Sequence, residues 1–318
     1  MKLLSPVNTF ESAVALIEAG TQEIYTGGDD SLFKVYSFSG RGKLGHDGIK
    51  VVNDFAALKK IVEYAHEHNV KVNFTANTQF FSDFQYGGKN LEKYYLDYIY
   101  GAIKAGVDSI IVGDVGLLKA LKHENLGVSL HGSVFLKTVN KEQVLFLKEN
   151  GVNRVTLSYH ITRGEIERLL QNKIMEYEVI GYMGCSFFNG ACSFLHEYGE
   201  GVLDSFCPGV SCKALYHIDG AKEPVNLFDI ESACVACQLR HLDALGVDAL
   251  KIVGRERSYN STAEVVSLYK RILEEKDTPV KEMLPAWWKR LFCKKHSCKY
   301  SENNTNSKFI IGGDFCDS

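Results

Sequence analysis

The stretch KAGVDSIIVGD, residues 104–114, contains the kind of junction that decides the fold of this chain. A helical pattern ends before Gly106, which can take the left-handed backbone conformation that closes a helix. An apolar, β-rich run begins only two or three residues later. The same order of helix, glycine and strand recurs at Gly20, Gly151 and Gly246. Repeated junctions of this kind are typical of alternating α/β folds.

Outward from this junction, the chain alternates between strand and helix patterns up to about residue 275. Eight such units with right-handed crossovers predict an α/β fold of the (β/α)8 TIM-barrel-like type. A doubly wound open sheet is the alternative, but no glycine-rich fingerprint follows the first strand. The predicted strands are 2–7, 23–26, 70–75, 109–113, 127–131, 154–158, 177–182 and 249–253. The predicted helices are 9–19, 54–68, 90–105, 115–124, 140–149, 163–171, 229–245 and 260–275.

Two long segments interrupt the alternation, 27–53 after the second strand and 183–228 after the seventh. Both follow the carboxyl end of a strand, the face on which barrel enzymes build their sites. Loops of this length in a compact domain are usually functional. We therefore predict a barrel domain at 1–275 with a cysteine-rich insert at 183–228. A C-terminal extension follows at 276–318, which is partly basic and could be flexible.

The overall composition indicates a conventional soluble protein. Hydrophobic residues make up 45% and charged residues 24%, and the net charge of −3 gives no reason to expect strong nonspecific binding to nucleic acid. No stretch approaches the ~18 apolar residues of a membrane span. We expect a cytoplasmic protein, in which clustered cysteines more often bind metals or catalyse reactions than form disulfides.

The nine cysteines are concentrated in one part of the chain. The first 184 residues contain none, and six lie within 185–237. Four of them occupy the insert and stand among small residues that leave space for an inorganic centre: Cys185, Cys192, Cys207 and Cys212. Four thiolates at one place can hold a metal ion or an iron–sulfur cluster.

Other uses of these cysteines remain open from spacing alone. Zinc could be bound by Cys207 and Cys212 together with Cys234 and Cys237, although the last two are expected in a helix, where they could simply pack. Buried or incidental thiols are a third possibility. The three cysteines of the extension are weaker signals, with a second metal site as one reading: Cys293, Cys298 and Cys316.

Several segments of the chain resemble peptidase family U32 over about residues 1–275. The most specific are the four cysteines of the insert with their flanking residues, and Lys251-Ile252-Val253-Gly254-Arg255 downstream. Further likeness lies at Glu23–Gly27, Val72–Thr78, Asp108–Asp114 and Arg154–Ser158. The tail lies outside this resemblance.

The resemblance implies an activity and a cofactor. The family was first described as collagenase-like proteases, and its better understood members resemble oxygen-independent hydroxylases with a 4Fe-4S cluster on four cysteines. Those members act in ubiquinone biosynthesis or modify tRNA and ribosomal RNA. By position, Cys185, Cys192, Cys207 and Cys212 match the cluster ligands, with Cys234 as the alternative fourth ligand. Cys237 could also replace one of the four.

The chain departs from the family's pattern at three places. Gly181-Tyr182 stands where many members have His-Gly, and His160 stands where many have Glu. The interval between Cys207 and Cys212 is one residue longer than in the RNA-modifying members. These differences bear on the substrate more than on the cluster.

Candidate catalytic residues follow the predicted strands. Arg255 could clamp a carboxylate or phosphate, or form an ion pair at the barrel rim. His131 and His160 could act as acid or base, or be structural histidines of the rim. Asn73 and Asn77 could orient a polar substrate or cap loops.

We predict an oxygen-independent hydroxylase that acts on a small aromatic or nucleobase-type substrate, either a small molecule or RNA. A collagenase-like peptidase is the alternative, although the chain has no Gly-x-Ser-x-Gly elbow and no His-Glu-x-x-His helix. A cluster-bearing subunit that pairs with a heteromeric partner of the same family is another. In that case the basic aromatic tail from Trp287 to Lys299 could bind RNA, or be a solvated or docking segment.

Overall fold

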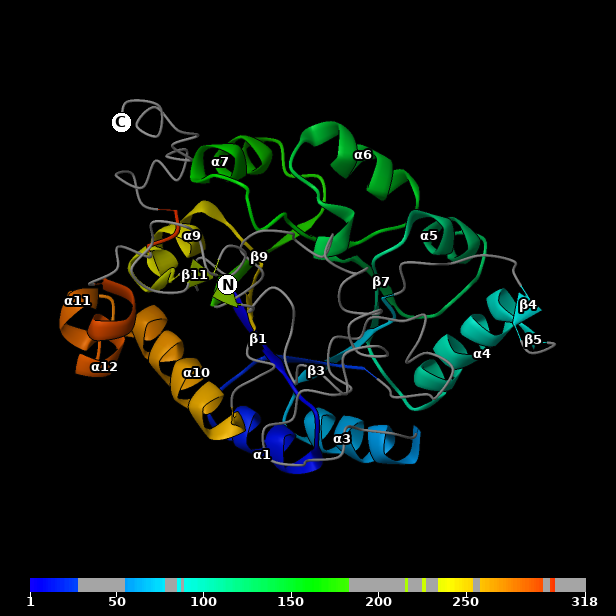
Figure 1. Cartoon of the computed structure of the whole chain (residues 1–318), viewed down its shortest axis with the longest axis horizontal. Coiled ribbons are helices and arrows are strands. Elements are labelled where there is room, and N and C mark those ends of the chain that lie inside the picture. Colours follow the sequence, from blue (N-terminus) through cyan, green and yellow to red (C-terminus); the bar gives the residue numbers. More distant parts are fainter. Residues whose placement is uncertain are drawn as a thin grey trace.

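The structure, a computed structural model, describes residues 1–27, 55–77, 85–86, 89–182, 215–216, 225–226, 234–253, 258–293 and 298–300. Eight parallel strands close into a barrel in the order β1-β12-β9-β8-β7-β6-β3-β2, and helices surround it (Figure 1). The predicted (β/α)8 fold is therefore confirmed. The barrel strands are β1 (Lys2–Pro6), β2 (Glu23–Thr26), β3 (Lys71–Thr75), β6 (Ser109–Val112), β7 (Ser129–Gly132), β8 (Arg154–Thr156), β9 (Glu176–Tyr182) and β12 (Ala249–Ile252).

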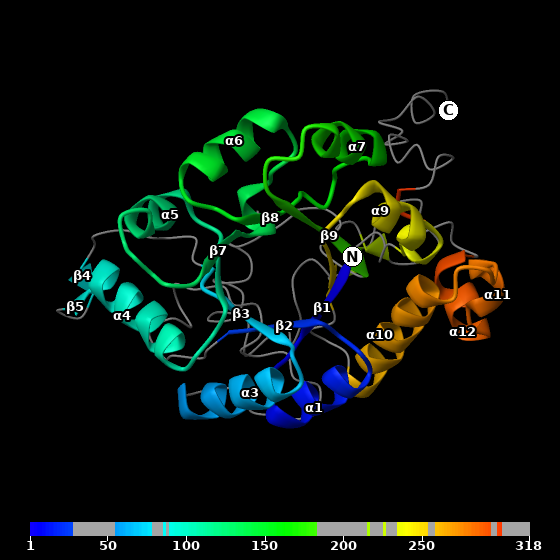
Figure 2. The ribbon, with the colours of Figure 1, turned by 180° about the vertical axis from the view of Figure 1, so that it is seen from behind.

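The view from behind shows the helices as one outer ring (Figure 2). Most begin at a side-chain cap: Thr9 and Thr162 form capping boxes, and Asn90, Asp114, Asn140 and Ser258 each accept a backbone N–H bond. The ring helices are α1 (Phe10–Glu18), α3 (Phe55–Glu67), α4 (Leu91–Lys104), α5 (Val115–Leu121), α6 (Lys141–Glu149), α7 (Arg163–Gln171), α9 (Leu239–Leu245) and α10 (Tyr259–Glu274). The four predicted helix-ending glycines all have positive φ, between 85° and 101°.

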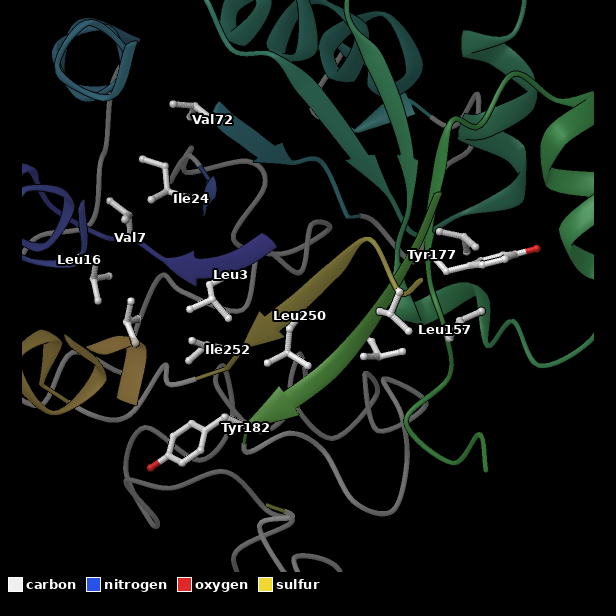
Figure 3. Close-up of a cluster of buried hydrophobic side chains, with 14 of the residues drawn as sticks. Leu3, Val7, Leu16, Ile24, Val72, Leu157, Tyr177, Tyr182, Leu250 and Ile252 are labelled. Carbon is white, nitrogen blue, oxygen red and sulfur yellow. The ribbon is translucent and has the colours of Figure 1, made fainter. Parts of the chain in front are cut away.

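Each barrel strand sends alternate residues to the helices and to the lumen. The outward residues are apolar and pack against the helices, as Leu3, Ile24 and Val72 do in Figure 3. The lumen holds a small apolar cluster of Leu4, Tyr25 and Ile111 together with charged side chains. The pairing of β12 with β9 shifts by one residue between Lys251 and Ile252, which brings Ile252 opposite Tyr182.

The expected helix at 229–245 is wrong in its first half. Cys234 forms isolated β-bridges with Tyr182 and with Cys298, and Cys237 lies in a 3-10 turn, η3 (Ala236–Gln238). Helix α9 begins only at Leu239. The backbone at Cys234 finds partners in two other segments, so tertiary pairing overrides the local helical pattern.

The described part of the extension packs on the barrel. It contains α11 (Val280–Met283), α12 (Ala286–Trp288) and a π-helical turn, η4 (Lys289–Cys293). Trp288 is fully buried, and its ring lies 5.4 Å from that of Tyr182 and 4.9 Å from that of Phe292. Trp288 is therefore not available to stack on RNA bases, and the buried Lys299 is not available to neutralise RNA phosphates.

Two short antiparallel pairs complete the described elements. They are β4 (Gln85–Tyr86) with β5 (Lys89–Asn90), and β10 (Leu215–Tyr216) with β11 (Val225–Asn226). A helix with the length and apolarity needed to cross a bilayer does not occur among the described residues.

Candidate functional site

The carboxyl ends of two neighbouring strands lead to the residues that the sequence singles out. Strands β9 and β12 are hydrogen-bonded neighbours and end at Tyr182 and Ile252. Cys185 and Arg255 each follow three positions later in the chain. Arg255 and the four insert cysteines, Cys185, Cys192, Cys207 and Cys212, lie outside the described residues.

The loop after β8 places His160 at this same end of the barrel. His160 is exposed, and its ring meets the buried ring of Tyr159 edge-on at 5.9 Å. Its backbone N–H donates to Ser158 Oγ at 3.4 Å. The position fits a group that meets a ligand at the rim, and its catalytic role stays a prediction.

The extension contributes a buried amine beside this loop. Lys299 Nζ lies 3.7 Å from the centre of the Tyr159 ring and 4.7 Å from that of Tyr300, and it has no hydrogen-bond partner among the residues that the structure describes. Burial lowers the pKa of Lys299 well below its usual range. The two aromatic faces compensate only part of the lost hydration.

Three buried polar atoms on the same side of the barrel also lack partners within the described residues: Thr75 Oγ1, Asn77 Oδ1 and Thr138 Oγ1. Thr75 ends β3, Asn77 follows it, and Thr138 lies beyond β7. Buried polar atoms are nearly always hydrogen-bonded in proteins. Unsatisfied groups at the carboxyl ends of barrel strands are therefore positions where a polar ligand can bind.

Inside the lumen, towards the amino ends of the strands, Arg154 is the centre of a buried charge network. Its guanidinium donates to Glu23 Oε1 at 2.9 Å and to Glu176 Oε2 at 2.7 Å, and it lies 3.9 Å from Glu178. Lys251 Nζ is 3.5 Å from Glu178 Oε1. Arg154, Glu23 and Glu178 are all at least 97% buried.

The contact between Glu23 and Arg154 shifts the pKa values of both groups. Burial alone would raise the pKa of Glu23, but hydrogen bonds and charge from Arg154, with help from Lys2, lower it to about 2. Burial would lower the pKa of Arg154, and Glu23 raises it above its ordinary value instead. Glu23 and Arg154 are therefore both ionised at neutral pH.

His131 belongs to this network and not to the rim. Its Nδ1 lies 3.3 Å from Ser109 Oγ, which donates to Asn73 Oδ1, and Asn73 Nδ2 donates to Glu23. Burial, followed by the charge of Arg154, lowers the pKa of His131 to about 3. The imidazole is therefore neutral at physiological pH. Asn73 uses both amide atoms in hydrogen bonds inside the barrel, whereas Asn77 Oδ1 has no partner among the described residues.

A cavity of about 520 Å³ opens at this amino-terminal end. Its lining includes Glu23, Ser109, His131, Arg154 and Glu176, of which all but His131 open a barrel strand. Residues at this end of a barrel usually serve the stability of the fold rather than its chemistry. Sequence reasoning missed the network, although charged residues at lumen-facing strand positions, such as Glu23 and Lys251, are an unusual pattern that marks it.

Comparison with known proteins identifies relatives along nearly the whole chain. The pattern of peptidase family U32 matches residues 8–310, so the likeness also extends into the tail, beyond the limit expected near residue 275. "tRNA hydroxylation protein P1" of Bacillus subtilis is 26% identical over 86% of this chain. A "Collagenase" of Porphyromonas gingivalis is 24% identical, also over 86% of this chain. The chain spans 63% and 65% of the lengths of these two relatives.

The fold has a counterpart among solved structures. The U32 peptidase Mk0906 superposes with a TM-score of 0.52 at 12% identity, covering 80% of this chain and 93% of that one. At this identity the similarity concerns the fold alone. Since the family pattern covers nearly all of the sequence, the chain belongs to peptidase family U32.

Proposed function

We propose that this chain is an iron–sulfur enzyme that hydroxylates a nucleobase-type or small aromatic substrate without molecular oxygen, with a tRNA base as the first candidate. One observation carries the proposal. In the sequence, Cys185 and Arg255 each stand three positions after the last residue of one of two adjacent barrel strands, whose carboxyl ends belong to the face where barrels carry their chemistry. Relatives named as tRNA hydroxylation proteins support the choice of substrate.

The four cysteines of the insert suit an iron–sulfur cluster. Cys185, Cys192, Cys207 and Cys212 lie within 28 residues, and four thiolates are the usual ligands of a 4Fe-4S cluster. A bound cluster would supply one-electron chemistry or bind an oxygen donor. Zinc on the same thiolates would be redox-inactive and would leave hydroxylation without an electron carrier.

The chain's own residues would position the substrate. Arg255 would bind a carboxylate or phosphate with its planar guanidinium, and the exposed His160 would hold or release a proton at the rim. The unsatisfied atoms of Thr75, Asn77 and Thr138 would hydrogen-bond polar edges of the substrate. We assign the neutral, buried His131 to the charge network rather than to the substrate.

Anaerobic purification tests the cofactor. The expected result is about four iron and four sulfide per chain, retained in Cys316→Ser and lost in Cys185→Ser.

Mass spectrometry of tRNA nucleosides from a strain lacking the gene tests the reaction. A hydroxylated nucleoside should disappear, return with the wild-type gene and fail to return with Cys185→Ser. An unchanged RNA profile would contradict the RNA substrate, and quinone analysis of the same strain would then test a small aromatic one.

Peptidase activity is the second candidate, because one relative is named a collagenase. Cleavage of gelatin by metal-free protein, abolished by a single cysteine substitution, would favour it over hydroxylation.

Two relatives, P1 and P2, come from the same organism, which suggests that family members could act together. Coexpression with a second family member followed by affinity capture tests that possibility, and a solitary, fully active protein would exclude the need for a partner.

A further inference from the structure

The C-terminal extension places one lysine at the carboxyl-terminal mouth of the barrel. Cys298 forms a parallel β-bridge with Cys234, and Cys234 forms a second bridge with Tyr182, the last residue of β9. The backbone N–H of Lys299 donates to the Cys234 carbonyl at 2.8 Å. The extension therefore continues the backbone pairing beyond the end of β9, and this pairing fixes the position of Lys299.

The amine of Lys299 is buried without an acceptor. The residue is 5% exposed, and its Nζ has no hydrogen-bond partner among the described residues. The nearest ring is that of Tyr159, in the loop after β8, and β8 is the hydrogen-bonded neighbour of β9. A buried polar group without a hydrogen bond lowers the stability of a fold. Lys299 therefore lies where it costs stability, between two strand ends that lead to the predicted site.

The docking of the extension does not need this amine. Trp288 is fully buried, Phe292 is 3% exposed, and their rings lie 4.9 Å apart against the barrel. A methionine of similar length could be buried in place of Lys299 without the desolvation of an amine. A group that lowers stability and adds nothing to docking is typical of a binding residue.

Two neighbouring residues show the same pattern. Tyr300 has a φ of 62°, which is unfavourable for a residue with a side chain, and its buried hydroxyl has no partner among the described residues. Thr138 is fully buried, its carbonyl accepts the backbone N–H of Ser158 at 2.8 Å, and its Oγ1 is equally unsatisfied within the described part of the chain. Backbone strain and unsatisfied polar atoms in one region are typical of ligand sites.

We propose that Lys299 Nζ binds the carboxylate of a small molecule at the mouth of the barrel, so that the extension completes the ligand site. The inference rests on the proposed function only in that the substrate site lies at this mouth. An ammonium group in a dry environment is strongly attracted to one opposite charge. A small carboxylate can be buried together with it, whereas the phosphates of RNA belong to a polymer that stays in contact with water.

The amine can meet such a ligand without movement of the backbone. Lysine carries its nitrogen on a flexible four-carbon stem, so rotation of the side chain brings Nζ to a ligand beside Tyr159. Burial lowers the pKa of Lys299 in the unliganded protein, and a bound carboxylate would favour the protonated form instead. The amine would take up one proton from water and form a charge-assisted hydrogen bond with the carboxylate.

Benzoate and its neutral analogue benzamide test the wild-type protein. At constant ionic strength, benzoate should raise the Tm of the purified full-length protein in a concentration-dependent way, whereas benzamide should not. An equal response to both compounds would show that the charge is not recognised and would overturn the proposal. The absence of any response to benzoate would overturn it too.

The variant Lys299→Met removes the amine and keeps the length of the side chain. Without ligand its Tm should rise by about 2 °C, since an unpaired amine is lost. Its apparent Kd for benzoate should increase by about tenfold or more. The exposed Lys289 of the same extension is the matched control, and Lys289→Met should change neither quantity. A lower Tm or a failure to fold in Lys299→Met would show that the amine is structural and would overturn the proposal.

Two further measurements separate this proposal from the proposed function. Lys299→Met should contain as much iron and sulfide as the wild type. If iron-containing wild type does not respond to benzoate, the carboxylate site is refuted and the hydroxylase proposal stands. If benzoate binds but no hydroxylated nucleoside or quinone depends on the gene, only the proposed function is refuted. A loss of tRNA affinity in Lys299→Met, with no benzoate binding by the wild type, would assign the amine to an RNA phosphate instead.

Discussion

Buried polar groups are paired at one end of the barrel lumen, whereas at the other end some of them have no partner within the described residues. At the amino-terminal end, Glu23, Arg154 and Glu178 are buried and paired with one another. At the carboxyl-terminal end, Thr75 and Asn77 are buried with atoms that have no partner within the described residues. A polar group that is paired within the protein stabilises the fold and has no free hydrogen-bonding capacity for a ligand. A buried polar group without a partner lowers the stability of the fold until a ligand forms a hydrogen bond with it. The paired groups that stabilise the fold and the unsatisfied groups to which we assign substrate binding thus lie at opposite ends of the barrel.

Removal of the Arg154 guanidinium from the charge network should have the largest effect on stability. Arg154→Met leaves Glu23 and Glu178 buried without their guanidinium, so the free energy of unfolding should fall by about 3–5 kcal/mol. Urea denaturation followed by circular dichroism measures the loss.

A surface arginine provides the matched control. Arg163 pairs with Glu167 one helical turn away at 3.1 Å, and both are partly exposed. Arg163→Met should therefore cost less than about 0.5 kcal/mol. Equal losses for the two variants would remove the distinction between the ends of the barrel.

Low pH should lower the free energy of unfolding through the titratable groups at the amino-terminal end of the lumen. The pKa of His131 is about 3 when folded and 6.5 in its ordinary state, so the unfolded chain binds a proton first and stability falls as pH drops from about 6.5 to 3. Glu23 contributes stability above pH 4.5 that is lost as pH falls towards 2. Denaturation between pH 7 and pH 4 should show a loss on the order of a few kcal/mol.

His131→Gln isolates the histidine contribution. It should flatten the dependence of stability on pH between about 6.5 and 4.5 and leave the Glu23 contribution below that range. An unchanged slope would mean that His131 is protonated in the folded protein.

The smallest expected effect on stability comes from the removal of single hydroxyl groups, one at each end of the lumen. Ser109→Ala removes the donor to Asn73 at the paired end and should cost about 1–2 kcal/mol. Thr75→Val removes a hydroxyl that has no partner among the described residues, so stability should stay level or rise by up to about 1 kcal/mol. Hydroxylation activity should fall in Thr75→Val if that hydroxyl binds substrate. A clear loss of stability in Thr75→Val would show that the group is already satisfied.

Most of the fold could be predicted from local patterns. The outward faces of the strands are continuous apolar sets, and glycine marks the ends of four helices, so strand and helix positions follow from the residues themselves. The segment around Cys234 was misassigned because its backbone partners, Tyr182 and Cys298, lie about 50 or more positions away. Pairing over such distances leaves no local signature.

The site could be predicted only in part. The insert cysteines and Arg255 stand out in the sequence by type and spacing, but they lie outside the described residues, and their roles stay predictions. The burial of Lys299 beside Tyr159 could not be foreseen, because the tail has no periodic pattern that would show where it docks. The charge network was equally hidden, since its members come from strands that are far apart in the chain, such as β2 with Glu23 and β8 with Arg154.

The contact between Glu23 and Arg154 has a consequence for how the chain folds. Strands β2 and β8 lie diametrically opposite in the closed barrel, and the two residues are 131 positions apart. A fragment that ended before β8 would lack the buried guanidinium that neutralises this carboxylate and would leave it with only the half-exposed Lys2, so neither half of the chain is a self-sufficient folding unit. The two halves, expressed as separate polypeptides, should remain largely unstructured alone and assemble into a barrel when mixed.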